Sequence, residues 1–175
     1  MKKTKIALVL MLGVALRVSA QKDSVYIAEQ KDEMTDKVYY YTSRQLLCVN
    51  PDDKKQGFAV TFFMDKKGDD VKTAELKVKV VGVGSCHEKD EIFFLLDGDV
   101  KVKGLMWNDF NCDGKAWFKI SESDKELLAE KKLLKIRVQN GRSYESYTHI
   151  VEPDNQDYFI QLFYSVKNQK IKTIK

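Results

Sequence analysis

The stretch of sequence that decides the fold is residues 58–80, FAVTFFMDKKGDDVKTAELKVKV. It opens with an apolar run, 58–64, and closes with a segment, 71–80, in which apolar and polar residues alternate. A period of two places successive side chains on opposite faces, so 71–80 predicts a half-buried strand. The polar residues 65–68 between the two runs are typical of a turn. We therefore expect two neighbouring strands, joined by this turn and paired antiparallel.

Similar signals recur along the rest of the chain. Segments that are apolar, alternating, or rich in aromatic and β-branched residues predict further strands at 38–42, 92–96, 100–103, 116–120, 136–138 and 144–150. Asp97-Gly98 and Asn140-Gly141 each separate two such segments, and both pairs favour tight hairpins; Asn140-Gly141 suits a type I′ turn. Consecutive strands with tight turns pair antiparallel, so we expect an antiparallel sheet or a β-sandwich.

Two segments favour helices instead. Residues 123–126, Ser-Asp-Lys-Glu, fit a capping box and predict a short helix after them. After Pro153, one face of a helix is indicated by the i, i+3, i+4, i+7 spacing of Phe159, Leu162, Phe163 and Val166. Because 158–164 is also rich in β-forming residues, a strand is the alternative there. The expected fold is mainly β (α+β), with one short internal helix and a C-terminal amphipathic helix.

The first twenty residues have the anatomy of a secretory signal peptide. A basic start at 2–5 precedes an apolar core at 6–16 and small residues at 18–20 that suit cleavage after Ala20. The core is shorter than the roughly 20 residues that a membrane-spanning helix needs, and no later segment is apolar enough to span. We expect one β-rich domain over 21–175 that is periplasmic or secreted and not embedded in a membrane.

Charge and missing motifs exclude several functions. The chain has 30 basic and 26 acidic residues, and the leader holds four of the basic ones and no acidic one. Taking those four away leaves 26 of each, so no net basic surface is expected for nucleic acid. A phosphate-binding loop, a dinucleotide fingerprint and a nucleophile elbow are absent from the sequence. We therefore expect no nucleic-acid partner and no cofactor, and an enzyme is not favoured.

Three cysteines in an exported protein suggest one disulfide. Cys86 and Cys112 lie in polar or glycine-rich segments that resemble loops, whereas Cys48 lies in the apolar segment 46–49. The sequence therefore favours a Cys86–Cys112 bridge, with Cys48 reduced and buried. Three unpaired thiols are the alternative.

The polar turn at 108–114 contains a weak candidate metal site. Asp109, Asn111 and Asp113 match the start of a calcium loop, in which alternate oxygen ligands converge on the ion. The twelfth position needs a bidentate carboxylate, and Ile120 stands there. We therefore expect these residues to form a plain turn, and no metal is favoured.

Two tryptophans, Trp107 and Trp117, flank this turn. Exposed aromatic side chains beside Asp and Asn are typical of sugar-binding faces, so the pair is a candidate ligand face. Packing in the core is the alternative. The three consecutive tyrosines at 39–41 cannot all face inward on a strand. His87 is expected in a surface loop, and His149 at the rim of a strand, without a metal or catalytic role.

Several short motifs resemble those of small exported bacterial proteins of uncharacterised function. The resemblance covers about residues 56 to 165. In chain order the motifs are Gly82-x-Gly84-x-Cys86-x-Glu88, Asp97-Gly98, Asn111-Cys112, Ile136-Arg137-Val138 and Ser143-Tyr144-Glu145-Ser146-Tyr147. The resemblance implies export and a single domain, and it carries no activity.

The leading functional hypothesis is a non-enzymatic exported domain that binds a protein or a glycan at the cell envelope. A small envelope hydrolase, using carboxylates that the sequence does not identify, is one alternative. A protease-inhibitor-like domain, whose disulfide-held turn at 108–114 enters a protease cleft, is the other. A flat aromatic face favours the binding module, and a deep pocket with two convergent carboxylates favours the hydrolase. A protruding rigid turn favours the inhibitor.

Overall fold

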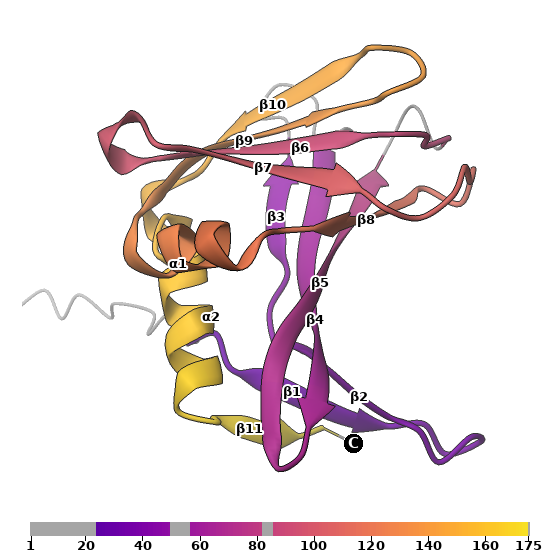
Figure 1. The fold of residues 1–175 in the computed structure, drawn as a ribbon, viewed down its shortest axis with the longest axis vertical. Helices are drawn as coiled ribbons and strands as arrows, with labels where there is room; N and C mark the ends of the chain where they lie inside the picture. The colour runs from indigo at the N-terminus through magenta and orange to yellow at the C-terminus, as the bar shows by residue number, and fades with distance from the viewer. Residues whose placement is uncertain (1–23, 50–56, 82–85, 175) are drawn as a thin grey trace, which may run out of the picture.

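The computed structural model describes residues 24–49, 57–81 and 86–174, which contain eleven strands in one mixed sheet and two α-helices (Figure 1). A mainly β fold with helices is therefore confirmed. The β-sandwich alternative is not confirmed, because the strands are hydrogen-bonded into a single sheet. The predicted leader, 1–20, lies outside the described residues.

The bounds of the elements follow the sequence pattern in most places. The strands are β1 (Ile27–Lys31), β2 (Val38–Thr42), β3 (Leu46–Val49), β4 (Gly57–Lys67), β5 (Asp70–Val81), β6 (Glu91–Leu96), β7 (Lys101–Met106), β8 (Lys115–Lys119), β9 (Leu133–Gln139), β10 (Ser146–Ile150) and β11 (Ile171–Thr173). The helices are α1 (Glu122–Glu130) and α2 (Tyr158–Lys167), and short 3-10 turns lie at Asp97–Asp99 and Pro153–Asn155. The sequence pattern does not predict β1, β3 or β11.

The sheet is long and strongly bent. Its strand order is β10-β9-β6-β7-β8-β5-β4-β2-β1-β11, and β3 also pairs with β4. Figure 1 shows β10, β9, β6 and β7 crossing the top, β4 and β5 running down the molecule, and β1, β2 and β11 at the foot. Neighbouring strands are antiparallel except β1 and β11, which are parallel. Both helices lie on the same side of the central strands (Figure 1).

The core lies between the sheet and α2. Phe62 of β4 is fully buried and meets Phe159 and Phe163 of α2 edge to face, with ring centroids 5.7 and 5.8 Å apart. Phe94 of β6 meets Phe159 from the upper strands at 5.4 Å. Such edge-to-face pairs add to the apolar area that each ring buries. The helix thus closes the inner side of the bend.

Both helices occur near their predicted positions. In α2 the predicted apolar stripe faces the core, with Phe159 and Leu162 fully buried. The capping prediction at Ser123 is wrong by two residues: α1 begins after Ser121, whose Oγ accepts a hydrogen bond from the Asp124 amide at 3.1 Å. Ser121 and Asp124 have the same serine-to-acid spacing, and Ser121 lies closer to the end of β8. Within the described residues, neither helix is long and apolar enough to cross a membrane.

The hairpin between β9 and β10 is present, but the predicted type I′ turn at Asn140-Gly141 is wrong. The connection spans 140–145, and Tyr144 rather than Gly141 has a positive φ, 60°. Tertiary contacts explain the difference. The Asn140 side chain donates to the Cys86 carbonyl at 2.8 Å, and its Oδ1 accepts from the Arg142 and Ser143 amides. An Asn side chain that bonds its own following backbone replaces the two-residue turn.

Candidate ligand-binding face

A row of aromatic rings lies on the side of the sheet that faces away from the helices. Phe63 follows Phe62 on β4, so its ring points to the opposite face. Tyr41 of β2 is directly paired with Phe63, and the ring centroids are 5.9 Å apart. Trp117 of β8 lies 5.1 Å from the Phe63 ring on its other side. We call Tyr41, Phe63 and Trp117 the aromatic row.

Lys77 of β5 lies between Phe63 and Trp117 of the aromatic row. Its register places it directly beside Trp117 on one side and Thr61 on the other. The Lys77 ammonium lies 5.3 Å from the Phe63 centroid and 5.1 Å from the Trp117 centroid. Cation–π attraction at these distances restrains both rings and keeps a positive charge beside them. Aromatic and cationic groups are therefore available on one surface.

A shallow cavity of about 270 Å³ opens over Tyr41 and Phe63 of the aromatic row, and Trp117 lies beside it, next to Phe63. Rings line it together with amide and hydroxyl groups; the side chains include Tyr39, Tyr41, Phe63, Gln30, Gln45 and Thr61. The Tyr41 hydroxyl donates to Gln30 Oε1 at 2.8 Å, which fixes both side chains. Tyr39 is 44% exposed at the edge. The cavity thus offers apolar ring surface flanked by groups that can donate or accept hydrogen bonds.

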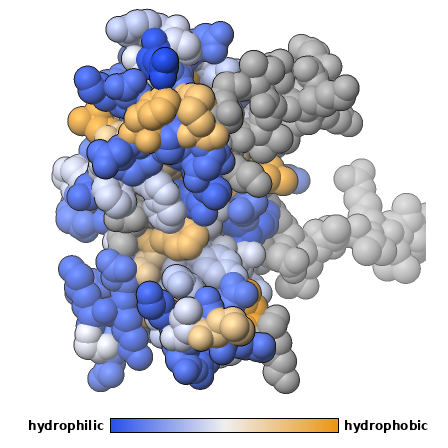
Figure 2. Space-filling view, turned by 90° about the vertical axis from the view of Figure 1, so that its right-hand side faces the viewer, coloured by the Kyte–Doolittle hydropathy of each residue, from blue (hydrophilic) through white to orange (hydrophobic). Residues whose placement is uncertain are grey.

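Figure 2 shows the molecule from the side opposite the helices. Where the surface is not grey, its hydrophobic groups form separate patches between polar residues. One continuous hydrophobic field would be the usual mark of a protein–protein interface. The broken pattern suits a ligand that carries apolar and polar groups close together.

The predicted tryptophan pair lies side by side, with the Trp107 amide donating to the Trp117 carbonyl at 3.0 Å. Trp117 is half-buried and belongs to the aromatic row. Trp107 is 46% exposed, and its ring lies 5.1 Å from the Lys119 ammonium. The pair is therefore not packed in the core, and Trp107 extends the aromatic surface beyond β8.

The predicted Cys86–Cys112 disulfide is present, and it joins the segment before β6 to the turn at 108–114. Cys48 is unpaired and buried, as expected, and burial raises the pKa of its thiol to about 12. A thiol with so high a pKa is almost wholly protonated at neutral pH, so it is a poor nucleophile. Cys48 therefore has a packing role on the inner face of β3.

The turn at 108–114 is tied to its surroundings at three points. The disulfide is one, and two backbone hydrogen bonds between His87 and Asn111, of 2.7 and 3.1 Å, are the second. The third is the Asn108 side chain, whose Oδ1 accepts from the Trp117 amide at 2.8 Å. The turn therefore positions the backbone of Trp117. Its tip exposes Phe110, whose ring lies 5.2 Å from the Arg142 guanidinium carbon.

The polar residues of this turn bond mainly to one another. Asp113 accepts from the Lys115 amide at 3.1 Å and pairs with the Lys115 ammonium at 3.3 Å. Partial desolvation acts to raise the pKa of Asp113, but the hydrogen bonds from Lys115 outweigh it and lower that pKa overall. The Asn111 side chain donates to the Asp109 carbonyl at 3.3 Å. The described residues hold no group of three His, Cys, Asp or Glu placed to bind a metal.

The expectation for His87 is wrong, because its side chain is buried rather than in a surface loop. His87 Nδ1 lies 2.5 Å from Oδ2 of Asp90, which is also buried. The other carboxylate oxygen of Asp90 accepts from the Glu88 and Gly141 amides at 3.2 and 3.1 Å. This polar cluster joins the β6 entry to the β9–β10 connection. His149, in contrast, is half-buried on the edge strand β10.

Comparisons with protein-family models, with curated proteins and with solved structures find no match to this chain. The functional assignment therefore depends on the geometry of the site. Sequence reasoning identified Trp117 and required that one of the tyrosines 39–41 face outward, but it missed Phe63. The signal available for Phe63 was its place directly after Phe62, because two neighbouring phenylalanines on a strand must lie on opposite faces.

Proposed function

We propose that this protein is an exported, non-catalytic binding module that holds a glycan of the cell envelope on its aromatic row. The observation that carries the proposal is the contiguous placement of Tyr41, Phe63 and Trp117, of which Tyr41 and Phe63 line a cavity together with amide and hydroxyl groups. A sugar ring has an apolar C–H face that packs on an aromatic ring, and hydroxyls around its rim that need hydrogen-bond partners. Sites of this kind combine mainly apolar walls with a few placed polar groups.

The size of the cavity supports an extended ligand rather than an enclosed one. Its volume of about 270 Å³ lies just below that of small-molecule pockets, which span roughly 300–1,000 Å³. A glycan chain would place one or two sugar units on the rings, and the rest would continue across the surface. Trp107, one strand beyond Trp117, offers a further stacking position.

The two alternatives find less support at this face. The described side chains that line the cavity include no carboxylate, so among them there is no acid–base pair for a hydrolase. The turn at 108–114 is exposed and disulfide-held, as an inhibitor loop requires. Its most exposed apolar side chain, Phe110, is however partly covered by Arg142. Its bonds to Trp117 fit a role in supporting the aromatic row.

Binding can be tested with defined oligosaccharides. Tetrasaccharides of N-acetylglucosamine and of β-1,4-glucose, titrated into the protein, should change its tryptophan fluorescence in a saturable way. Phe63→Ala removes the central ring and should weaken binding about tenfold, the equivalent of 1.4 kcal/mol. Tyr164→Ala is the matched control, because Tyr164 is 57% exposed on α2, away from the aromatic row. It should leave binding unchanged.

The outcomes separate the proposal from its alternatives. Loss of binding in Phe63→Ala but not in Tyr164→Ala supports it. Absence of saturable binding to either sugar, or equal binding by both variants, would reject the aromatic row as a glycan site. Reducing ends that appear during the incubation would show hydrolysis and overturn the non-catalytic assignment.

Export is a separate part of the proposal. It rests on the sequence of 1–20 and on the disulfide, which persists in oxidising compartments. The intact mass of protein recovered from outside the cytoplasm should correspond to a chain that starts at Gln21. Material that retains Met1 would reject this part alone.

A further inference from the structure

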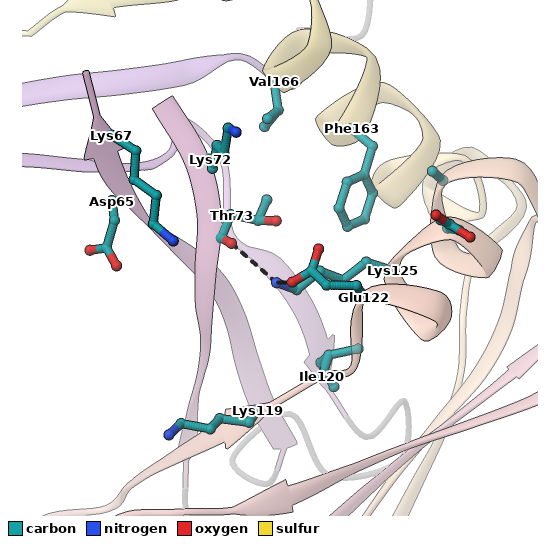
Figure 3. A pocket seen from close by; sticks show the side chains of 12 residues that line it. Asp65, Lys67, Lys72, Thr73, Lys119, Ile120, Glu122, Lys125, Phe163 and Val166 are labelled. Carbon is teal, nitrogen blue, oxygen red and sulfur yellow. Dashed lines mark hydrogen bonds and ion pairs between the residues drawn. The ribbon is translucent and has the colours of Figure 1, made fainter. Parts of the chain in front are cut away.

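A second cavity, of about 660 Å³, lies on the helix side of the sheet (Figure 3). It opens between the far end of the β4–β5 hairpin and the two helices. The hairpin supplies Lys67 and Lys72, α1 supplies Lys125, and α2 supplies Phe163 and Val166. This volume falls inside the range of small-molecule pockets.

The walls of this cavity differ in chemistry. Figure 3 shows Phe163 and Val166 reaching from α2, while Lys67 and Lys72 lie across from them on the hairpin. Phe163 is held in place by its edge-to-face contact with Phe62, 5.8 Å between centroids. One side of the cavity is therefore apolar and well fixed, and the other carries flexible cationic side chains.

Lys125 supplies a buried cation at the inner end. Its side chain is only 8% exposed, and its ammonium donates to the Thr73 carbonyl at 3.1 Å and to Glu122 Oε1 at 2.7 Å. These bonds are drawn in Figure 3. An ammonium group has three donors, and the third has no acceptor among the described residues. A buried cation with an unused donor favours an acceptor that arrives with a ligand.

The remaining charges limit the ligand to a low negative charge. Glu122, Glu126 and Asp65 also line the cavity, and Glu122 is neutralised by Lys125. Against the other two carboxylates stand Lys67 and Lys72, which have no ion-pair partner within the described residues, whereas the Lys119 ammonium lies against the Trp107 ring on the other face of the sheet. These charges balance, so the spare donor of Lys125 remains for one anionic acceptor. A polyanion would meet the carboxylates, and a molecule without an acceptor would leave that donor unmatched.

We propose that this cavity binds a long-chain carboxylate, with its head group at Lys125 and its chain along Phe163 and Val166. The apolar wall recognises the chain through burial of its methylene groups. The spare donor of Lys125 and the hairpin lysines recognise the head group. The site is independent of the aromatic row, because the two lie on opposite faces of the sheet.

The proposal separates head-group recognition from chain recognition in one titration series. Decanoate, 1-decanol and acetate are titrated into the full protein by calorimetry. Decanoate should bind in a saturable way, 1-decanol about tenfold more weakly, and acetate without measurable saturation. Lys125→Met keeps an unbranched stem of similar length and should weaken decanoate binding about tenfold. Lys101→Met, an exposed lysine of β7 outside the cavity, is the matched control.

Two further variants keep the test decisive if Lys125→Met does not fold. The double change Lys67→Met and Lys72→Met alters only exposed side chains and should weaken decanoate but not 1-decanol. Val166→Asp should abolish decanoate binding through repulsion and loss of the apolar wall. Equal binding of decanoate and 1-decanol, acetate binding as tight as decanoate, or no saturable decanoate binding by the wild-type protein would each overturn the proposal. None of these results bears on the glycan titration.

Discussion

Phe62 and Phe63 are neighbours in the chain, yet their surroundings are opposite. Phe62 is fully buried and meets two rings of α2. Phe63 is half-buried and meets Tyr41 and Trp117 on the side without a helix. The same side chain therefore stabilises the fold at one position and forms a candidate binding surface at the next. The difference comes from the helix, which covers only one face of the sheet.

The same contrast occurs two strands away. Phe118 of β8 is fully buried, whereas Trp117 before it is half-buried and belongs to the aromatic row. On the face without a helix, the rings of the aromatic row contact each other and Lys77, whereas rings on the opposite face contact α2. A sheet covered on one side only leaves its other face free to evolve chemistry without disturbing the core. The pairs 62/63 and 117/118 therefore allow the two roles to be tested separately.

The largest expected effect is that of Phe62→Ala. Removing a fully buried ring leaves a cavity against α2 and should lower the free energy of unfolding by about 3–5 kcal/mol. Phe63→Ala removes ring contacts at a half-exposed position and should cost only about 1–2 kcal/mol. Urea unfolding of both variants measures the contrast. Equal losses would mean that the outer face is packed like a core, and the comparison would fail.

Local patterns were sufficient to predict most of the sheet. The alternation in 71–80 and the turn residues before it specify the β4–β5 hairpin through neighbours in the chain. β1 and β11 carry no such pattern, since each is short and they pair in parallel with each other across the length of the domain. A strand defined by a distant partner leaves little signal in its own residues. β3 was missed for a related reason, because its four residues suit a buried segment of any kind.

The candidate site was harder to predict than the fold. The run 58–64 is apolar on both faces, so periodicity could not show which ring of the Phe62–Phe63 pair faces outward. A register shift between Phe63 and Met64 adds to this ambiguity. Trp117 was identified only because polar residues stand near it in sequence. The burial of His87 could not be inferred, because it depends on the connection at 140–145 folding back over Asp90.

Breaking the disulfide should test the outer face separately from the core, because the bridge holds only the turn at 108–114 beside the aromatic row. The double change Cys86→Ser and Cys112→Ser should cost about 3 kcal/mol, since the bridge closes a loop across a separation of 26 residues. The turn at 108–114, which positions the backbone of Trp117 through Asn108, would lose one of its three ties, so tetrasaccharide binding should weaken as well. Thiol labelling of unfolded, unreduced wild-type protein should modify Cys48 alone. Three labelled cysteines would contradict the bridge.

A smaller loss is expected from Asp90→Asn. The carboxylate of Asp90 accepts from His87 and from two backbone amides. In asparagine the oxygen can still accept from the amides, but the nitrogen that then faces His87 Nδ1 is a donor and cannot accept from it. Hydrogen bonds to charged groups contribute about 1.5–3 kcal/mol, so a loss of about 2 kcal/mol in urea unfolding is expected. Asp99→Asn, at an exposed position, is the control and should change little. Equal stability of both variants would show that the buried His87–Asp90 pair does not contribute to the free energy of unfolding.

The smallest effect concerns pH and the edge strand β10, on which His149 is half-buried. Desolvation lowers the pKa of His149 from its ordinary value of 6.5, and Glu152 only partly opposes it. The unfolded chain therefore binds a proton more readily than the folded one. The stability that His149 contributes is fully present above pH 6.5 and is lost as the pH falls below it toward the lowered pKa. The urea concentration at the midpoint of unfolding should therefore decrease as the pH is lowered from 7.5 to 5.5.

His149→Gln isolates this contribution, because glutamine keeps a polar group on β10 but does not titrate. The difference in midpoint between the wild-type protein and the variant should shift in favour of the variant as the pH falls, while other titrating groups cancel in the comparison. The shift should be small, since the His149 ring is only half-buried and water still reaches part of it. A difference that stays constant from pH 7.5 to 5.5 would mean that folding does not desolvate the His149 ring.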